Sequence, residues 1–421
     1  MKKVNTLIIG SGISGLAYAA NTDDDYLILE KDSSPGGLCR TFYVDGFVWD
    51  YAGHFFHFVN PHLKKKFELE INDNNMVKCI KSTNVNYNGI NVEYPFQMNI
   101  HQLPKDEFID CLYDLFHRIE KEKYTNFEDM LYGKFGKSIT EKFLKPYNEK
   151  LYACSLDKLD PDAMGRFFPY ADPAQIIDNM KKNNVQTYNS TFDYPVQGAQ
   201  FFVERLLGKI NLDKLLLNSC VEAIDINAKT VIVDGMSYQY NKLINTMPLN
   251  QFVKILSGVD AAYDGIFNCN KVLVFNLGFD KQAMDIKTHW TYVPMRNINF
   301  YRMGFYSNIL GSDRLSMYIE IGYKEDEKID VENQLKATLE NLRKLGIITD
   351  HKLIAYNALV INPAYVHIAA ESAKQVIKLQ DLLKEKSVYT IGRYGKWTYC
   401  SIEDCMLDAI NLAREISTRV V

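Results

Sequence analysis

The sequence has no long uninterrupted apolar run and no excess of either charge. No segment reaches the ~18 consecutive apolar residues of a transmembrane helix. Its 48 Lys and Arg against 52 Asp and Glu give a net charge of −4, and no tract is basic enough to predict a nucleic-acid interface. We therefore expect neither a membrane span nor a nucleic-acid partner.

The eight cysteines lack both a CxxC pair and the spacing of metal ligands. This pattern predicts reduced thiols and no metal site. The first 20 residues begin with two lysines and are largely apolar, as in a secretory signal, but Gly10, Gly12 and Gly15 interrupt them. We therefore expect a cytoplasmic protein.

What is present is typical of a globular protein. Apolar residues make up 47% and charged residues 24%, and 421 residues suggest two or three domains. Aromatic residues, at 13% with 27 tyrosines, are the one excess. A tyrosine has an apolar ring with a polar hydroxyl, which suits the wall of a hydrated ligand-binding cavity. Ordinary packing in the core and at the surface is the alternative explanation for the excess.

A glycine-rich turn follows the first predicted strand, at residues 4–9. Gly10, Gly12 and Gly15 have GxGxxG spacing, and a second apolar run at 26–29 ends at Glu30. In a dinucleotide-binding unit, such glycines permit the tight turn, the approach of backbone to a pyrophosphate and the packing of helix on strand, while the acid binds ribose. An ordinary glycine-rich turn is the alternative, and the strand–turn–helix context favours the dinucleotide site.

The segment after Glu30 distinguishes FAD from NAD. Residues 31–41 contain Gly36, Gly37 and Arg40, and they resemble the segment that wraps the FAD diphosphate in flavoproteins of the glutathione reductase and amine oxidase type. We expect FAD to be held by this segment, the turn and several later segments. The predicted cofactor-binding residues are Gly10, Gly12, Ser14, Gly15, Glu30, Lys31, Gly37, Leu38, Arg40, His54, Val221, Gly392, Arg393, Glu403 and Asp404.

The rest of the chain predicts an α/β protein in which a Rossmann-like FAD-binding domain is joined by a helical insertion and an antiparallel β-sheet domain. Amphipathic periodicity predicts helices in residues 98–185. Short β-rich runs between 229 and 323 predict a separate antiparallel sheet, and a helix is expected near 331–345. A strand at 388–391 and a helix at 403–417 close the chain. The predicted FAD-binding domain comprises residues 1–80, 200–245 and 385–421, and the sheet domain comprises 81–97, 186–199 and 246–384.

Six further segments narrow the match, and they occur in the same order over nearly the whole chain. Residues 47–57, 94–100, 146–153, 245–249, 300–302 and 392–399 resemble UDP-galactopyranose mutases, flavoenzymes related to amine oxidases. Each segment is short, but the six in register are specific.

The resemblance implies three catalytic residues. Arg166 and Arg302 correspond to the arginines that hold the substrate diphosphate, and His54 corresponds to a histidine whose loop lies against the flavin. A guanidinium binds phosphate in a forked geometry that lysine cannot reproduce. The alternatives are surface ion pairs for the arginines and a structural histidine for His54.

The resemblance also implies a substrate pocket with three parts. The uridine pocket comprises Tyr94, Phe96, Gln97, Asn148 and Tyr152. The diphosphate donors are Tyr292 and Tyr399, and the sugar contact is Asn189. An edge strand with core aromatics remains the alternative for residues 94–97, and a turn or cap for Asn148.

Four positions depart from the pattern of the family. Lys81 stands where an arginine near the flavin is expected, and Asn362 where a tyrosine is expected. Tyr152 replaces a usual tryptophan, and the stretch that begins at Cys400 differs. These departures affect the prediction of which sugar is bound more than the prediction of the reaction class.

The resemblance implies a non-redox mutase that interconverts pyranose and furanose forms of a UDP-sugar, most simply UDP-galactose, for cell-surface polysaccharide synthesis. Reduced FAD is the active form, its N5 attacks the anomeric carbon, and an external donor supplies the electrons. An amine-oxidase-like FAD oxidoreductase and a flavin-binding module without catalysis are the alternatives. The sequence leaves a homo-oligomer open.

Overall fold

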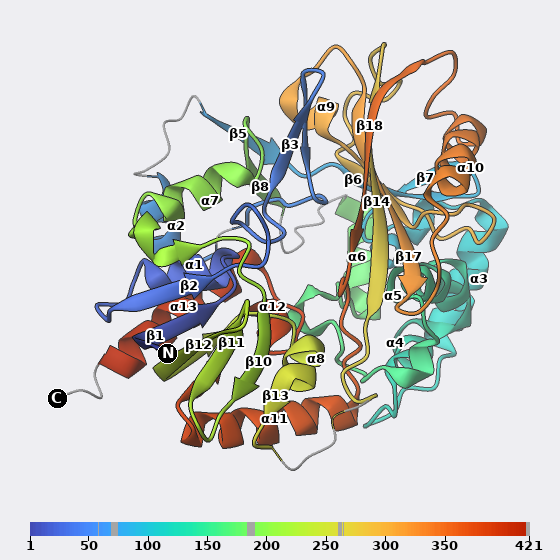
Figure 1. The fold of residues 1–421 in the computed structure, drawn as a ribbon. Coiled ribbons are helices and arrows are strands. Elements are labelled where there is room, and N and C mark those ends of the chain that lie inside the picture. The colour runs from blue at the N-terminus through green and yellow to red at the C-terminus, as the bar shows by residue number, and fades with distance from the viewer. Residues whose placement is uncertain (58, 69–74, 183–189, 260–262, 264, 418–421) are drawn as a thin grey trace.

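A computed structural model describes residues 1–57, 59–68, 75–182, 190–259, 263 and 265–417. Two large sheets lie side by side, and the N- and C-terminal segments come together at the first of them (Figure 1). The predicted α/β class with a separate antiparallel sheet is therefore confirmed.

The first sheet has eight strands in the described part of the chain, in the order β13-β10-β11-β12-β1-β2-β9, with β19 also paired to β12. Its parallel centre joins both ends of the chain, because β12 pairs with the first strand and with the last. The strands are β1 (Lys2–Ile9), β2 (Tyr26–Leu29), β9 (Leu215–Leu216), β10 (Val221–Asp225), β11 (Thr230–Val233), β12 (Met236–Asn245), β13 (Leu256–Ser257) and β19 (Val388–Thr390).

The helices that pack on this sheet come from both ends of the chain. α1 (Ile13–Ala19) lies against α13 (Ile402–Ser417) and α7 (Gln200–Leu207), and α11 (Ala370–Glu385) lies against β19. Leu16, Tyr18 and Ala413 are fully buried between the helices and one face of the sheet. The strand–turn–helix units at the two ends of the chain thus share one core.

The second sheet has the order β18-β14-β17-β16-β15-β6-β7, and all its pairs are antiparallel except β15 with β6. The strands are β6 (Thr83–Tyr87), β7 (Ile90–Glu93), β14 (Asn270–Phe279), β15 (Trp290–Tyr292), β16 (Arg302–Phe305), β17 (Ser316–Lys324) and β18 (Leu353–Ile361). The run at 230–233 was grouped with this sheet by its β-rich pattern and with the FAD-binding domain by the predicted boundaries. It forms β11 of the first sheet, because a tight turn pairs it with β12. The division of the chain into three domains stays a prediction.

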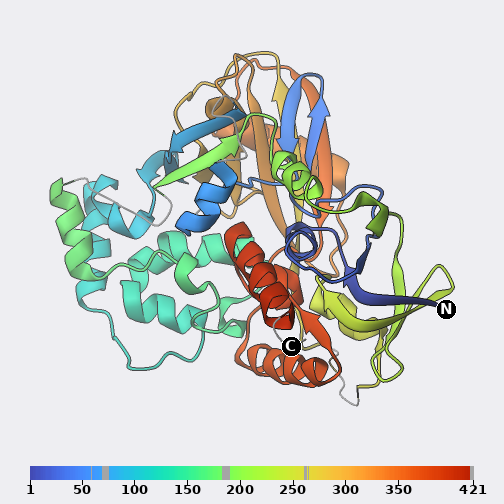
Figure 2. The ribbon, with the colours of Figure 1, turned by 90° about the vertical axis from the view of Figure 1, so that its left-hand side faces the viewer.

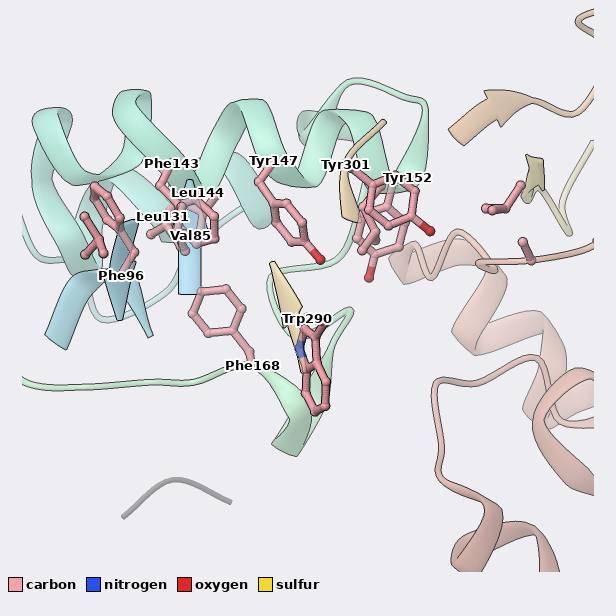
Figure 3. Close-up of a cluster of buried hydrophobic side chains, with 14 of the residues drawn as sticks. Val85, Phe96, Leu131, Phe143, Leu144, Tyr147, Tyr152, Phe168, Trp290 and Tyr301 are labelled. Atoms are coloured by element: carbon pink, nitrogen blue, oxygen red, sulfur yellow. The ribbon is translucent and has the colours of Figure 1, made fainter. Parts of the chain in front are cut away.

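The predicted helical region at 98–185 is present as far as residue 182, where this stretch of described residues ends, on one side of the molecule (Figure 2). Its helices are α3 (Lys105–Phe116), α4 (Phe127–Ile139), α5 (Lys145–Tyr152) and α6 (Pro173–Lys182), and a π-helical turn, Thr140–Leu144, joins α4 to α5. Phe143, Tyr147 and Tyr152 place their rings along the side of the π-helical turn and α5 that faces Phe168 and Trp290 (Figure 3). The helical region and the second sheet thus share an aromatic core.

Smaller elements connect these parts. Two-stranded sheets pair β3 (Thr41–Val44) with β4 (Phe47–Asp50) and β5 (Met76–Ile80) with β8 (Thr191–Pro195). The remaining helices are α2 (Pro61–Glu68), α8 (Leu249–Phe252), α9 (Tyr306–Leu310), α10 (Val331–Lys344) and α12 (Gly392–Gly395). The predicted helices at 331–345 and 403–417 are thereby confirmed as α10 and α13. Among the described helices, none has the length and apolar character needed to cross a membrane.

Candidate functional site

The glycine-rich turn joins β1 to α1 at the parallel centre of the first sheet. Gly10 has φ +96°, and a Cβ there would lie 2.3 Å from the Thr246 hydroxyl oxygen. A Cβ on Gly15 would lie 2.0 Å from the carbonyl oxygen of Gly10, so only glycine allows the helix to start this close to the strand. Two of the three glycines therefore have the steric roles that the dinucleotide motif predicts.

Glu30 at the end of β2 is tied to this turn. Its Oε2 accepts hydrogen bonds from the backbone N–H of Ser11 (2.8 Å) and the Ser11 hydroxyl (2.6 Å), and its Oε1 accepts from Asp32 N–H (3.0 Å). The backbone N–H of Ser219 donates to the Glu30 carbonyl, two residues before Val221 begins β10. The carboxylate thus lies where the two strands and the turn meet, and its contact with a ribose stays a prediction.

Arg40 stabilises the segment that follows Glu30 through several hydrogen bonds. It donates to the Gly37 carbonyl, to the Ser34 hydroxyl and to the Asp32 carboxylate at 2.6 Å, and its guanidinium lies over the Tyr51 ring at 4.6 Å. The segment closes over the turn, because a Cβ on Gly37 would lie 3.2 Å from the Cα of Gly12. Leu38 is half-buried in the same segment, whereas Lys31 is exposed.

The C-terminal segment reaches the same turn. Gly392 has φ +79°, and a Cβ there would lie 2.3 Å from the hydroxyl oxygen of Ser14 in the first turn of α1. The next residue, Arg393, places its guanidinium 4.5 Å from the Tyr399 ring centre and 5.5 Å from that of Tyr365. Its buried Nε has no hydrogen-bond partner among the described residues, as expected of a group that faces a bound anion or carbonyl.

The two acids at the start of α13 have protein partners. Glu403 is buried and accepts hydrogen bonds from the backbone N–H groups of Val59 and Asn60, so it anchors the loop that follows His57. Asp404 pairs with Arg166, with both carboxylate oxygens 2.7 Å from Nη2. A direct contact of either acid with the cofactor therefore stays a prediction, and their roles here are to hold a loop and an arginine.

A cavity of about 710 Å³ lies beside this cofactor region, between the second sheet and the helical region. Its wall brings together six residues that were singled out from the sequence and that lie far apart along the chain: Lys81, Tyr94, Arg166, Tyr292, Arg302 and Tyr399. Cations and neutral hydroxyl groups converge here on a space large enough for a nucleotide-sized ligand.

Tyr292, Arg302 and Glu320 form a row across three neighbouring strands. Tyr292 on β15 is opposite Arg302 on β16, and Arg302 is opposite Glu320 on β17. The guanidinium donates to the Glu320 carboxylate, which is only 2% exposed, while the Arg302 side chain remains 19% exposed towards the cavity. Trp290 Nε1 donates to the Tyr292 hydroxyl (2.9 Å), so the hydroxyl proton of Tyr292 is left to donate elsewhere.

Arg166 approaches the cavity from the helical region. It lies in the short 3₁₀ turn Gly165–Phe167, its side chain is 50% exposed, and Asp404 holds it. Because one partner belongs to the helical region and the other to α13, this ion pair joins the two faces of the cavity mouth. An anion that bound Arg166 would compete with Asp404 for it.

Aromatic rings form the rest of the wall. The Tyr94 and Tyr292 rings lie 4.7 Å apart, the Tyr147 and Tyr292 rings 5.2 Å apart, and Tyr365 stacks on Tyr399 at 6.0 Å. Burial raises the pKa of Tyr94, Tyr147 and Tyr292, so these hydroxyls are neutral donors at pH 7.

Three basic groups near the cavity have their pKa values lowered by burial. Lys81 lies 5.6 Å from the centre of the Tyr94 ring, and its pKa falls to about 8. The pKa values of His54 and His57 fall to about 4, so both imidazoles are neutral at pH 7. His57 lines the cavity, whereas His54 is outside its wall and pairs through Nδ1 with the Ala52 carbonyl (3.0 Å).

Four predicted uridine contacts lie behind the cavity wall. Phe96 is fully buried and stacks on Phe143, and Gln97 donates to the Pro169 carbonyl. Asn148 donates to the Leu144 carbonyl (2.6 Å), and Tyr152 is 1% exposed. The four residues pack behind the lining residues and support the wall, and their contact with a ligand stays a prediction. Asn189 lies outside the described residues.

The residues that line the cavity from α5 are one position away from those expected. Tyr147 and Leu151 are on its wall, while Asn148 and Tyr152 are on the neighbouring stripe of the helix. The i, i+4 spacing of Tyr147 and Leu151 is visible in the sequence, but it does not say which of two adjacent stripes faces the ligand.

Tyr365 is a further lining residue that the sequence analysis missed. Asn362 was expected to mark a lost tyrosine contact, and it is exposed, whereas Tyr365, three residues later, is on the cavity wall. Asn270 fixes this position, because its Oδ1 accepts from Tyr365 N–H (2.7 Å) and its Nδ2 donates to the Leu151 carbonyl (2.6 Å). Asp178 and Asn179 of α6, also missed, line the cavity as well. Within the described ranges, no cluster of His, Cys, Asp and Glu could hold a metal ion.

Comparisons with known proteins agree with this geometry. Residues 8–68 match the protein-family model described as an NAD(P)-binding Rossmann-like domain. A zeta-carotene-forming phytoene desaturase from Myxococcus xanthus is 43% identical over 47 residues, a segment that covers 10% of this chain and 9% of the desaturase. The match to this curated relative is therefore confined to a small part of its length.

The fold extends the likeness to the whole chain. A crystal structure of reduced UDP-galactopyranose mutase matches with a TM-score of 0.91 at 22% identity, over 100% of this chain and 95% of that one. A cyclohexylamine oxidase from Brevibacterium oxydans IH-35A matches with a TM-score of 0.71 at 14% identity, over 98% of this chain and 99% of that one. A fatty acid isomerase from P. acnes matches with a TM-score of 0.66 at 13% identity, over 98% of both chains. The resemblance inferred from the sequence is thus confirmed at the level of the fold.

Proposed function

We propose that this protein is an FAD-dependent mutase that interconverts the pyranose and furanose forms of a UDP-sugar, most simply UDP-galactose. The observation that carries the proposal is the convergence of Arg166 and Arg302 on one aromatic cavity beside a dinucleotide-binding turn. A nucleotide sugar needs just these three elements: cations for its diphosphate, rings for its base and a cofactor next to its sugar.

FAD fits the residues beside the cavity. The glycine turn, Glu30 and the Arg40 segment would hold its adenosine and diphosphate, and Gly392 and Arg393 would hold its flavin end. The unpartnered Nε of Arg393 supports this assignment, because a buried guanidinium N–H requires an acceptor. The cofactor supplies, in its reduced state, a nucleophilic nitrogen for the anomeric carbon, and an external donor supplies the electrons.

The cationic groups of the cavity stabilise the leaving diphosphate. Two guanidiniums that approach from opposite walls bind its oxygens, and the Tyr292 hydroxyl can add a neutral hydrogen bond. Glu320 holds Arg302 in place and offsets part of its charge. The weaker grip of Arg302 on the diphosphate favours release of the nucleotide from the arginine when the bond between sugar and nucleotide forms again. The arginines thus act on the charge that develops when the anomeric bond breaks.

The aromatic wall orients the nucleoside and excludes water. Tyr94 and Tyr147 offer ring faces and edges to a base, and Tyr365 and Tyr399 close the side next to Arg393. Exclusion of water protects the reactive sugar from hydrolysis while it is detached from the nucleotide. A place in the synthesis of cell-surface polysaccharides would follow from this substrate.

An amine-oxidase-like oxidoreductase is the second candidate, and the likeness to cyclohexylamine oxidase favours it. An oxidase of apolar amines has no need of two arginines at its substrate cavity, which is why the mutase is preferred. The test is incubation of the dithionite-reduced protein with UDP-galactofuranose, followed by chromatography of the nucleotide sugars. Conversion in the reduced state alone supports the mutase, while flavin reduction by an amine, without conversion of any UDP-sugar, supports the oxidase.

A further inference from the structure

Two cysteines lie within reach of each other at the start of α13. The Sγ atoms of Cys400 and Cys405 are 3.6 Å apart, and both residues are partly exposed free thiols. A disulfide requires about 2.05 Å between sulfurs, so an approach of roughly 1.5 Å closes the bond. Cys400 precedes the helix and Cys405 is in its first turn.

The environment of Cys405 favours its thiolate. The hydrogen bond between the two thiols lowers the pKa of Cys405, and the Arg393 backbone N–H and the Ser14 hydroxyl lower it further. The same hydrogen bond raises the pKa of Cys400. Burial raises the pKa of Cys39, Cys111 and Cys269, so the thiols of those cysteines are inert by contrast.

The pair lies against the proposed cofactor site. Cys405 contacts Ser14 in the first turn of α1, and Ser14 is the residue that Gly392 approaches. On the other side, Asp404 joins the same turn of α13 to Arg166 at the cavity mouth. Cys405 in α13 and Cys400 just before it therefore lie between the dinucleotide turn and the cavity.

We propose that Cys400 and Cys405 are a redox-active pair that passes two electrons to the bound flavin. The inference rests on the proposed FAD site. In the transfer, both thiols lose their protons and one electron each, and an S–S bond forms between them. FAD takes the two electrons and one proton, and the other proton goes to water. A small dithiol or a dithiol protein then reduces the disulfide by two thiol–disulfide exchanges.

The test begins with anaerobic holoprotein in its oxidised state and dithiothreitol as the dithiol, with the visible flavin absorbance as the readout. We expect the flavin of the unmodified protein to be reduced at least about tenfold faster than that of Cys400→Ser or Cys405→Ser. Cys220→Ser, which changes an exposed cysteine, is the matched control and should behave as the unmodified protein. Dithionite, which needs no thiol, should reduce all four proteins at the same rate.

A second readout follows the sulfurs directly. Trypsin releases residues 397–414 as one peptide that contains Cys400 and Cys405 and no other cysteine. After oxidation of the dithiol-reduced protein through its flavin by air, this peptide should resist alkylation and lack the mass of two hydrogens. Equal rates of flavin reduction by dithiothreitol in all variants, or a fully alkylated peptide at that point, would overturn the proposal.

The result is separable from that of the mutase assay. Cysteine-dependent flavin reduction, with no conversion of UDP-sugars after dithionite reduction, would contradict the proposed function and support electron transfer from Cys400 and Cys405 to the flavin. Conversion after dithionite reduction, with no cysteine dependence of the dithiol reaction, would do the opposite.

Discussion

Arg302 and Glu320 face each other directly across β16 and β17, and the guanidinium donates to the carboxylate. Glu320 is buried beneath the cavity, and the ion pair with Arg302 offsets the cost of removing its carboxylate from water. The ion pair fixes one edge of the guanidinium and leaves its other N–H groups, including a buried Nε without a partner among the described residues, to meet a ligand. This relationship makes Arg302 the first target for mutation.

Arg302→Lys should lower kcat/KM for the UDP-sugar by about 100-fold, because an ammonium keeps the charge but cannot bind Glu320 and two phosphate oxygens in one plane. The visible flavin spectrum should be unchanged, which separates loss of the diphosphate contact from loss of the cofactor. Arg296→Lys is the control, since Arg296 is an exposed arginine paired with Glu149. Loss of FAD from the Arg302 variant would show that the arginine is misassigned.

Asp404→Asn should lower KM for the UDP-sugar by about 1.4- to fivefold, because a surface ion pair worth about 0.2–1 kcal/mol no longer competes for Arg166. The effect should disappear in the Arg166→Lys background, where the competition is weaker. Glu415→Gln removes an exposed carboxylate of the same helix that pairs with Lys384, and it should leave KM unchanged. A rise of KM in Asp404→Asn would mean that the carboxylate itself serves the ligand.

The binding of the substrate should depend on pH through Lys81. Its pKa of about 8 means that the ammonium is charged below pH 8 and neutral above it, so attraction to the diphosphate is lost as the pH rises. KM should therefore increase by about three- to tenfold between pH 7 and pH 9. Lys81→Arg stays charged over this range and should abolish the rise, and a rise that persists in this variant would assign it to another group.

Tyr147→Leu and Asn148→Ala test which stripe of α5 meets the ligand. Loss of the Tyr147 ring should weaken UDP binding, measured by calorimetry, by about 1–3 kcal/mol, the usual worth of a base stacked on an aromatic ring. Asn148→Ala removes the hydrogen bond to the Leu144 carbonyl and should cost about 1 kcal/mol of unfolding free energy without changing UDP affinity. The reverse pattern would restore the original expectation for Asn148.

Gly15→Ala should abolish retention of FAD, because the new methyl group would overlap the carbonyl oxygen of Gly10 and push α1 away from the turn. The measurement is the ratio of flavin to protein after purification. Gly208→Ala, where a Cβ has 3.6 Å to its nearest neighbours, should retain a full complement of the cofactor. Retention by the Gly15 variant would contradict the role of the turn.

The parts of the site that depend on local sequence could be predicted. Gly10 and Gly15 lie within one strand–turn–helix unit, and their spacing predicts the close approach of the helix to the strand that the structure has, whereas the contact of Glu30 with a ribose stays a prediction. The second sheet and the helical region could likewise be read from periodicity, because each residue pattern selects its own secondary structure. The β-rich pattern of Thr230–Val233 alone suggested the wrong sheet, since a strand's own pattern does not say which of two sheets it joins.

The contacts between distant segments could not be predicted. Arg166 and Asp404 are 238 positions apart, and nothing in either segment indicates the other. The same is true of Tyr365, which Asn270 places on the cavity wall through a hydrogen bond over 95 positions. The pairing of Cys400 and Cys405 is local, but only the backbone geometry at the start of α13 brings their sulfurs together.

The most direct test of the account is to follow product and flavin in the same anaerobic sample. Dithionite-reduced holoprotein receives a large molar excess of UDP-galactofuranose, and chromatography and visible absorbance are recorded over time. We expect many molecules of UDP-galactopyranose per flavin while the flavin stays reduced. Product limited to one per flavin with reoxidation of the flavin, or no product while UDP binds normally, would contradict it.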